Sequence, residues 1–469
     1  MPCTRRQLLA LTALAPTLLA AKPSTNIRVD ELTTEFQDFL YRTPYKFGGR
    51  EVDRVTMLNV RCRVSSQAGK SAEGSASMSM GNIWAFPALP YDTTLGAMKN
   101  LALRLATITR DYKTPAHPLD INHELEPAYL KAATETSRDL NLAQPIPKLC
   151  TLVTASPIDA AIHDAFGKLH QRNAFVTSGR DFVRHDLSHY LANPEFRGEY
   201  LDQYVARRPA ARVRMYHSVG ASDPLSAADP HTPINDGLPE TLEAWIPYSG
   251  ITAIKIKLNG ADLVWDSDRV AEIDRVTTRA QAARGFADWI YSLDFNERCP
   301  SAQHVLDFTL RLKQIAPNAF ARVQYIEQPT ARDLNANRTN TMFEVAKLRP
   351  VVIDESLTGL DALLTAREMG YTGVALKACK GHSQTLLLAA AAQKYKMFRC
   401  VQDLTCPGAA LVHSVGIAAW IPGTSALEAN AREYVPSASK GWEARYPGIF
   451  NVRNGYLDTK GLDVPGLGT

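Results

Sequence analysis

Three carboxylates in the second half of the chain each follow a short apolar run. They stand in Leu293-Asp294-Phe295-Asn296-Glu297, Ile326-Glu327-Gln328-Pro329 and Ile353-Asp354-Glu355-Ser356. Anionic oxygen donors that are brought together repel one another unless a hard cation lies between them. Ligand sets made only of oxygen favour Mg²⁺, and Mn²⁺ also fits them. The three acids therefore predict a site for Mg²⁺ or Mn²⁺.

Each acid could instead cap the helix that follows its strand, as Asp and Asn often do. One such residue would not indicate a metal site, but three of them in consecutive strand–helix units favour one. Glu355 competes with Asp354 for the third ligand position, and Asp354 is preferred because it directly follows the run Val351–Ile353. We expect Asn296, Gln328 and Glu355 to support the ligands.

Lysines form the second chemical group. Lys255 and Lys257 alternate with isoleucine and therefore share one face of a strand. Two ammonium groups close to each other and to a divalent cation lower each other's pKa, and a lysine tuned in this way can act as a general base. A strand with its lysines in solvent is the alternative. Lys377 ends a later apolar run, so a substrate lying between Lys257 and Lys377 would have a lysine on either face.

Eight short apolar runs that alternate with helical stretches must position these side chains. They are Arg212–His217, Ala253–Leu258, Ile290–Phe295, Val323–Glu327, Val351–Asp354, Gly373–Lys377, Phe398–Gln402 and Thr424–Ala429. Strands that alternate with helices indicate parallel βαβ units, and eight of them predict a (β/α)8 barrel. The strand ends surround one mouth in that fold, so acids and lysines converge there.

The first part of the chain reads as mixed α and β. The patterns predict a strand over Arg54–Val64, a hairpin partner over Ser75–Met80, a helix over Thr93–Thr109, a loop over Tyr41–Gly49, and a helix over Pro157–His170 with Ser156 as its N-cap. We therefore predict an α+β capping domain at 27–150 and a barrel at 151–429. A tail at 430–469 is expected to pack on the capping domain.

The order Lys-x-Lys, Asp-x-Asn, Glu-Gln-Pro, Asp-Glu-Ser and a further strand-end lysine resembles the muconate lactonizing enzyme subgroup of the enolase superfamily, within the mandelate racemase/muconate lactonizing enzyme family. The segment Pro157–Lys168 resembles that family's first barrel helix. The resemblance implies a modified TIM barrel with an N-terminal capping domain. It also implies one Mg²⁺ with the ligands Asp294, Glu327 and Asp354.

The same resemblance implies that Lys257 and Lys377 are the acid/base pair and that Lys255 assists Lys257 or touches the substrate. The implied reaction is removal of a proton α to the carboxylate of a small molecule, through a metal-stabilised enediolate. Racemisation, epimerisation or cycloisomerisation would follow. An acid-sugar dehydratase and a non-catalytic exported binding protein remain as alternatives.

Two differences from the sequences of relatives narrow the range of possible substrates. The seventh run ends in Val401-Gln402-Asp403, without the histidine of the mandelate racemase type, and the eighth carries Glu428-Ala429-Asn430 where dipeptide epimerases have Asp-x-Asp. A dipeptide substrate is therefore doubtful. The segments Arg42–Gly49 and Met80–Trp84 are expected to determine substrate specificity. The candidate substrate contacts are Arg42, Tyr45, Lys46, His382 and Asp403.

The composition is that of a soluble globular protein, with 45% apolar and 21% charged residues. The net charge of +4 is small, and no basic stripe suggests nucleic-acid binding. The seven cysteines show no Cys-x-x-Cys spacing, so we expect buried thiols without a disulfide framework. A long polar connection at 171–211 is expected to cover the mouth or to form a contact in a homo-oligomer.

The N-terminus carries the features of an export signal. Arg5 and Arg6 precede the apolar run Leu8–Ala20, and small residues follow. The adjacent arginines resemble a twin-arginine signal over residues 1–21, and an ordinary secretory signal is the alternative. We therefore expect a periplasmic protein. The rest of the sequence holds no apolar segment long enough for stable insertion into a membrane.

Overall fold

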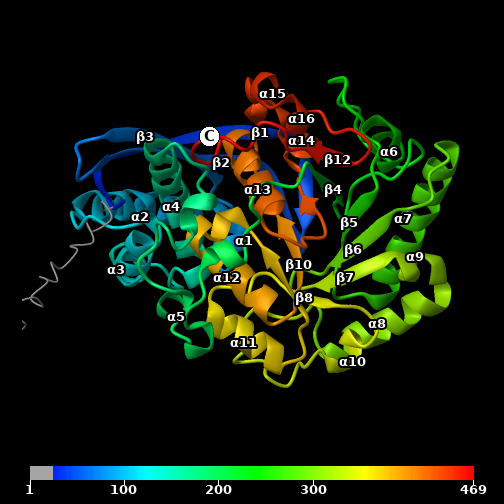
Figure 1. Ribbon diagram of the computed structural model, residues 1–469. Coiled ribbons are helices and arrows are strands. Elements are labelled where there is room, and N and C mark those ends of the chain that lie inside the picture. The colour runs from blue at the N-terminus through cyan, green and yellow to red at the C-terminus, as the bar shows by residue number, and fades with distance from the viewer. Residues whose placement is uncertain (1–24) are drawn as a thin grey trace, which may run out of the picture.

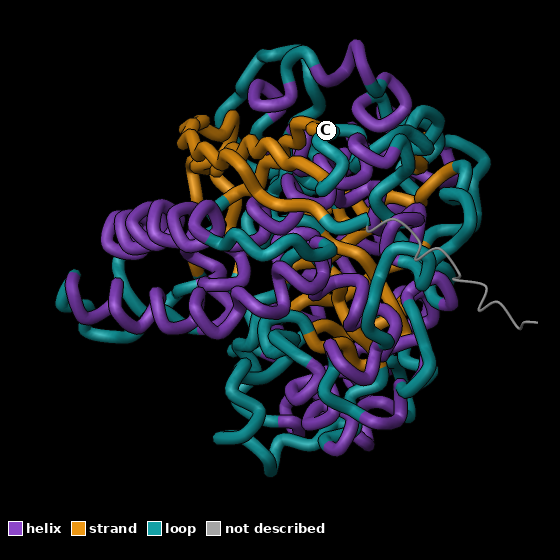
Figure 2. Tube along the Cα trace, turned by 60° about the vertical axis from the view of Figure 1, so that its left-hand side comes forward, coloured by secondary structure: helices purple, strands orange, loops and turns teal. Residues whose placement is uncertain are grey.

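The computed structural model describes residues 25–469, and the predicted export signal lies outside that range (Figure 1). A three-stranded N-terminal sheet with its helices lies beside a closed barrel of parallel strands. Figure 2 shows helices and loops surrounding the central strands. Within residues 25–469, none of the helices has the length and apolar character needed to cross a bilayer.

The N-terminal sheet has the order β1-β2-β3, with both pairings antiparallel. Its strands are β1 (Ile27–Phe47), β2 (Arg50–Ser66) and β3 (Ser71–Ser79). The helices that accompany it are α1 (Asn82–Ala85), α2 (Tyr91–Asp111) and α3 (Pro118–Asp139). The predicted strands and the predicted helix within this region are confirmed, each longer than the pattern indicated.

The predicted loop over Tyr41–Gly49 is wrong for its first seven residues, which continue β1 to Phe47. Only Gly48 and Gly49 form the turn, with φ values of 53° and 70°. Glycine adopts this left-handed conformation without steric cost, so the hairpin can reverse in two residues. The register shifts between Leu40 and Tyr45, which marks a bulge in the strand.

The helix predicted from Pro157 is also longer than expected, because α4 spans Lys148–His170 with Pro157 inside it. A proline has no N–H, so the carbonyl of Val153 loses its helical partner. The hydroxyl of Ser156 donates to that carbonyl at 2.8 Å, so Ser156 is not an N-cap. The helix is buried over most of its length, and packing outweighs the cost of the proline.

All eight predicted barrel strands are present and parallel. They are β4 (Arg212–Val219), β5 (Ala253–Lys257), β6 (Ile290–Asp294), β7 (Val323–Glu327), β8 (Val351–Ile353), β9 (Gly373–Leu376), β10 (Phe398–Gln402) and β11 (Leu427–Glu428). Each pairs with the next, and β11 pairs with β4 to close the barrel. The predicted (β/α)8 fold is confirmed.

Helices on the outside connect these strands. They are α6 (Leu242–Ser249), α7 (Leu263–Ala283), α8 (Ala302–Ile315), α9 (Pro317–Arg322), α10 (Phe343–Ala346), α11 (Leu360–Glu368), α12 (His382–Lys394) and α13 (Gly408–Trp420). The connection before β4 carries one short α-helix, α5 (Leu187–Tyr190), and three 3-10 helices, Val176–Ser178, Pro194–Phe196 and Leu201–Gln203.

The tail contacts both parts of the molecule. Its elements are α14 (Ala431–Tyr434), α15 (Trp442–Arg445), α16 (Pro447–Phe450) and β12 (Tyr456–Asp458). The hydroxyl of Thr469 donates to the carbonyl of Ser75 in β3, while β12 pairs antiparallel with β4 of the barrel.

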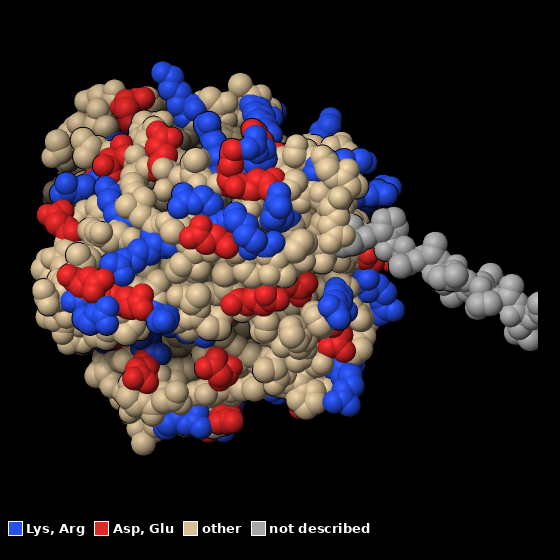
Figure 3. Space-filling view, turned by 90° about the vertical axis from the view of Figure 1, so that its left-hand side faces the viewer, with Lys and Arg blue, Asp and Glu red and all other residues tan. Residues whose placement is uncertain are grey.

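The surface and the cysteines show the character that the composition indicated. On the face shown in Figure 3, acidic and basic side chains are interspersed over a largely uncharged surface. Six cysteines lie in the described part of the chain, and all six are buried and free: Cys62, Cys150, Cys299, Cys379, Cys400 and Cys406. The predicted burial of the thiols is confirmed for these six.

Candidate active site

The three predicted metal ligands lie at the C-terminal ends of three neighbouring strands. Asp294 ends β6, Glu327 ends β7, and Asp354 directly follows β8. Asp294 and Glu327 face each other in register along the parallel pair. All three side chains are at most 1% exposed, so their charges are shielded from water.

The two lysines of β5 point into the same mouth. Lys257 pairs in register with Asp294, and its Nζ lies 2.5 Å from Asp294 Oδ2. Lys255 is deeper, and its Nζ lies 2.9 Å from Glu327 Oε2 and 2.8 Å from Glu428 Oε2. It also lies 3.1 Å from Asp294 Oδ2. The alternative of solvent-exposed strand lysines is therefore excluded.

Lys377 lies on the far side of the mouth, directly after β9. Its Nζ is 2.7 Å from Asp354 Oδ2, and Lys380 Nζ is 3.0 Å from the other carboxylate oxygen. β5 is the second and β9 the sixth strand of a closed eight-stranded ring. Lys257 and Lys377 therefore approach the centre of the mouth from opposite sides.

The carboxylates beside these lysines act against the expected lowering of the lysine pKa values. Burial alone would lower the pKa of Lys257, but the adjacent Asp294 carboxylate outweighs it and raises the pKa. The pKa of Lys377 is raised in the same way by Asp354 against the effect of burial. Each lysine is thus the counterion of a carboxylate, which favours its charged form.

The donor set suits a hard divalent cation. Burial, followed by the charge of Asp294, raises the pKa of Glu327 well above its usual value, which is the repulsion that a bound cation relieves. Glu355 Oε2 is buried and has no hydrogen-bond donor among the described residues. The three predicted ligands do not form a group whose ligand atoms all lie within 4.8 Å of one another, and Lys255 contacts both Asp294 and Glu327.

The predicted supporting residues surround the acids. The backbone N–H of Asn296 donates to Asp294 Oδ1 at 2.9 Å, and Gln328 Oε1 accepts from the backbone N–H of Asp354 at 2.9 Å. Glu355 accepts from the indole N–H of Trp84 at 2.9 Å.

Sequence reasoning did not single out Gln402, Lys380 or Glu428 as contacts of the acids and lysines. The side-chain amide of Gln402 donates to Glu327 Oε2 at 2.5 Å. Gln402 and Glu428 end barrel strands, and their positions in the final two apolar runs were the signal that could have identified them.

Aromatic side chains of the capping domain cover the mouth. Lys377 Nζ lies 4.3 Å from the centre of the Trp84 ring, and Lys257 Nζ lies 5.8 Å from that of Phe47. Both rings come from the segments expected to choose the substrate. The two lysines are only 6% and 4% exposed, so these rings and the barrel wall shield them from water.

The five candidate substrate contacts divide into two groups. Tyr45 and Asp403 are buried beside the mouth, where Tyr45 Oη lies 3.1 Å from Ser218 Oγ. Burial, followed by the charge of Glu428, raises the pKa of Asp403 to about 8. Arg42 is held by the carboxylate of Asp236.

Lys46 and His382 do not face the mouth as expected. The side chain of Lys46 is exposed to solvent. His382 is fully buried, with its Nδ1 3.0 Å from His413 Nε2 and its ring packed on His163 and Phe175. The apolar helices α12 and α13 draw this histidine into the core, and the loop position in the sequence did not reveal that packing.

A cavity of about 300 Å³ lies at the C-terminal end of β4, beside the mouth. Arg42, His217 and Glu433 line it, and His217 Nδ1 lies 2.8 Å from Glu433 Oε1. Burial lowers the pKa of His217 to about 3, so this imidazole is neutral. The cavity is polar and could hold part of a small substrate.

The profile of the family described as Enolase C-terminal domain-like matches residues 238–469. Comparison with curated proteins gives no match.

Solved structures share the fold over nearly the whole chain at low sequence identity. A dipeptide epimerase from Enterococcus faecalis V583, complexed with Mg and the dipeptide L-Leu-L-Tyr, has 12% identity and a TM-score of 0.61, covering 94% of this chain and 99% of its own. A muconate lactonizing enzyme from Pseudomonas fluorescens, complexed with muconolactone, has 15% identity and a TM-score of 0.57, covering 94% and 96%. An enolase from Bradyrhizobium, complexed with magnesium and mandelic acid, has 16% identity and a TM-score of 0.56, covering 94% and 95%.

Proposed function

We propose that this chain, whose residues 238–469 belong to the enolase C-terminal domain-like family, is a racemase or epimerase that moves the proton next to a substrate carboxylate. The resemblance to the enolase superfamily is confirmed by this match and by the fold of the solved relatives. One observation carries the finer proposal. Lys257 and Lys377 reach the mouth from opposite sides of the barrel, so each faces one side of a substrate carbon.

Asp294, Glu327 and Asp354 would hold the Mg²⁺. When bound, the cation stabilises the negative charge that develops on a substrate carboxylate as its α-proton leaves. The lysines supply and accept the proton: one takes it from its own side of the carbon, and the other delivers one to the opposite side. Lys255 keeps three carboxylates in place through its contacts with Asp294, Glu327 and Glu428.

A lysine can take a proton only when it is neutral. In the structure, Asp294 keeps Lys257 charged and Asp354 keeps Lys377 charged. The same carboxylates are the proposed metal ligands, so sharing their charge with a cation weakens the hold on both lysines. Trp84 and Phe47 exclude water from the two ammonium groups, which strengthens every charge interaction in the mouth.

Cycloisomerisation on the same scaffold would need proton transfer on one face only, and dehydration would need a leaving group on the neighbouring carbon. The lysine on the second face therefore favours racemisation or epimerisation. The relatives include a dipeptide epimerase and a muconate lactonizing enzyme, so both outcomes are compatible with the fold.

The test is Mg²⁺-dependent exchange of the α-proton in D₂O, with a panel of acid sugars, amino-acid derivatives and aromatic carboxylates. Lys257→Ala and Lys377→Ala should each abolish inversion, and each should retain exchange with one of the two stereoisomers at most. Lys347→Ala is the control, because Lys347 is a surface residue of the barrel paired with Glu344. Wild-type exchange and inversion in both lysine variants would show that the proton transfer uses other groups.

We also propose that the protein is exported, since adjacent Arg5 and Arg6 precede an apolar run. Replacing both arginines by lysine keeps the charge and removes the feature that a twin-arginine receptor reads. The double variant should accumulate in the cytoplasm, measured by cell fractionation. Unchanged export would favour an ordinary secretory signal, and a cytoplasmic wild-type protein would refute export altogether.

A further inference from the structure

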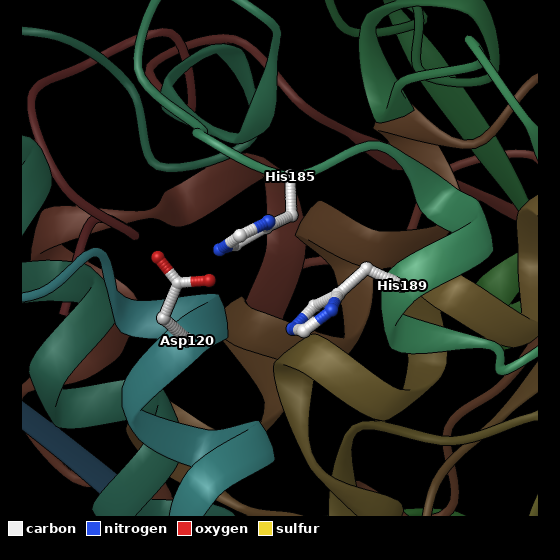
Figure 4. A group of neighbouring side chains, drawn as sticks. All are labelled: Asp120, His185 and His189. Carbon is white, nitrogen blue, oxygen red and sulfur yellow. The ribbon is translucent and has the colours of Figure 1, made fainter.

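A second group of metal-ligand side chains lies away from the barrel mouth. Asp120, His185 and His189 bring one ligand atom each to within 4.8 Å of one another. Figure 4 shows the carboxylate and both imidazole rings directed toward a common point. Asp120 lies in the first turn of α3, while His185 precedes α5 and His189 is part of it. The group therefore joins the capping domain to the long connection at 171–211.

The two histidines are held on one side of a short helical turn. Asp186 caps α5 by accepting from the backbone N–H of Ser188 at 3.1 Å, which fixes the start of that turn. The rings of His185 and His189 stack with their centres 4.1 Å apart. The stacking keeps the two imidazole rings side by side next to Asp120.

The carboxylate is oriented by a further hydrogen bond. The hydroxyl of Tyr190 donates to Asp120 Oδ1 at 2.5 Å, and Tyr190 is 8% exposed. Metal-ligating carboxylates commonly have such a donor on one oxygen, which directs the other oxygen toward the metal. Asp120 is itself 9% exposed, so its charge lies close to the protein interior.

A further imidazole, that of His123, lies beside the group. His123 lies one turn after Asp120 on α3, and its ring centre is 4.8 Å from that of His189. Asp120 and His123 are spaced by three residues on α3, and His185 and His189 are spaced by four residues on the segment that contains α5.

We propose that Asp120, His185 and His189, with His123 as the fourth ligand, bind a transition-metal ion, and that Zn²⁺ fits best. Imidazole nitrogens with one carboxylate oxygen are ligands that Zn²⁺ accepts in tetrahedral sites, whereas Mg²⁺ prefers oxygen alone. The site differs in this respect from the oxygen-only set in the barrel. A bound ion would fasten α5 and the connection that carries it onto α3.

The experiment is a calorimetric titration of the metal-free full-length protein with Zn²⁺, in a large excess of Mg²⁺ that occupies the barrel ligands. We expect one Zn²⁺ per chain. His185→Ala and His189→Ala should lose this binding, and Tyr190→Phe should weaken it by roughly 10-fold to 100-fold. His231→Ala is the matched control, because His231 is a partly exposed histidine whose ionic partner is Glu240.

Cu²⁺ provides a second readout, since its electron paramagnetic resonance spectrum reports nitrogen ligands. Nitrogen couplings should appear in the wild type and in His231→Ala, and should diminish in His185→Ala and His189→Ala. Circular dichroism and Mg²⁺-dependent proton exchange establish that each variant is folded. If the double variant His185→Ala/His189→Ala binds Zn²⁺ as the wild type does, or if the wild type binds none, the site is refuted whatever the outcome for the barrel.

Discussion

The indole N–H of Trp84 donates to Glu355 Oε1 at 2.9 Å, and this bond joins the capping domain to the mouth of the barrel. Trp84 lies in α1, while Glu355 follows the proposed ligand Asp354. The same indole ring lies under the ammonium group of Lys377. One side chain of the cover thus positions a carboxylate and shields a proposed catalytic lysine.

Trp84→Phe separates these two roles, because phenylalanine keeps a ring beneath Lys377 and loses the N–H donor. Burial and the adjacent Asp354 raise the pKa of Glu355 to about 8, so near neutral pH the indole N–H binds a mostly neutral carboxyl group. A hydrogen bond to a neutral group contributes about 0.5–1.5 kcal/mol, which predicts a fall in kcat of up to about 10-fold. Steady-state kinetics checks this, with Trp265→Phe on α7 as the control; equal kcat values in both would contradict it.

Chelation of Mg²⁺ should abolish proton exchange and leave the fold intact. Lys257 and Lys377 already neutralise Asp294 and Asp354 at 2.5 and 2.7 Å, so the acids have counterions without a metal. We expect the melting temperature in EDTA to fall by no more than a few degrees, and activity to return when Mg²⁺ is restored. Cooperative unfolding on chelation, followed by circular dichroism, would show that the lysines do not serve this purpose.

Lys255→Met should destabilise the protein strongly in the absence of Mg²⁺. The fully buried ammonium contacts Asp294, Glu327 and Glu428, and its removal leaves buried carboxylates uncompensated. Breaking a buried ion pair from one side costs about 3–5 kcal/mol of unfolding free energy. Denaturant titration should show that saturating Mg²⁺ recovers part of this loss, since the cation supplies the missing charge. A loss that does not depend on Mg²⁺ would argue against a cation site beside Lys255.

Gly74→Ala should disrupt the packing of β3 on α4. A Cβ at this glycine would lie 2.3 Å from the carbonyl oxygen of Ala161 and 2.3 Å from the backbone nitrogen of Ala165. Backbone atoms in a buried helix cannot give way easily, so we expect a loss of about 3 kcal/mol or more. Gly96→Ala in α2 meets no atom within 4 Å and should stabilise by about 1 kcal/mol through helix propensity. Thermal unfolding of the two variants checks this prediction. Similar stabilities of Gly74→Ala and Gly96→Ala would contradict a tight contact between β3 and α4 at Gly74.

His117 should contribute to acid denaturation. Burial lowers its pKa from 6.5 to about 3 in the folded protein, and its ring accepts from the backbone N–H of Leu119. Its contribution to stability is complete above pH 6.5 and is lost as the pH falls toward 3. The loss at pH 4.5 is about 3 kcal/mol. His117→Asn keeps a helix-capping acceptor without a titrating ring, so its unfolding free energy should fall less between pH 7 and pH 4.5. Parallel curves for both proteins would refute this contribution.

The arrangement of strands was predictable because a parallel strand buried on both faces is a continuous apolar run. The eight runs became β4–β11, and the acids at the ends of three of them became neighbours at one mouth. The period-2 rule likewise placed Lys255 and Lys257 on one face, which the structure confirms. Local pattern and barrel topology together were sufficient for these features.

Helix boundaries and charge states were less predictable, since they depend on distant contacts. The sequence pattern predicted that a helix begins at Pro157, but α4 is buried and continues through this proline. The hydroxyl of Ser156 donates to the carbonyl of Val153, which has no helical N–H partner. The sequence also predicted that the repulsion between the two lysines, together with a nearby divalent cation, lowers their pKa values. The folded chain raises them, because each ammonium has a carboxylate as its nearest partner.

The sequence by itself determined which chemical groups gather at the barrel mouth, because the local pattern of apolar residues predicts the strands, their order and the residues at their ends. Only the tertiary structure decided what lies against them: that Trp84 binds Glu355, that Glu428 pairs with Lys255, and that His382 is in the core. It also brought Asp120 to His185 and His189. These pairs are far apart in the chain, and their contacts follow from the packing of whole elements, which no short window of sequence encodes.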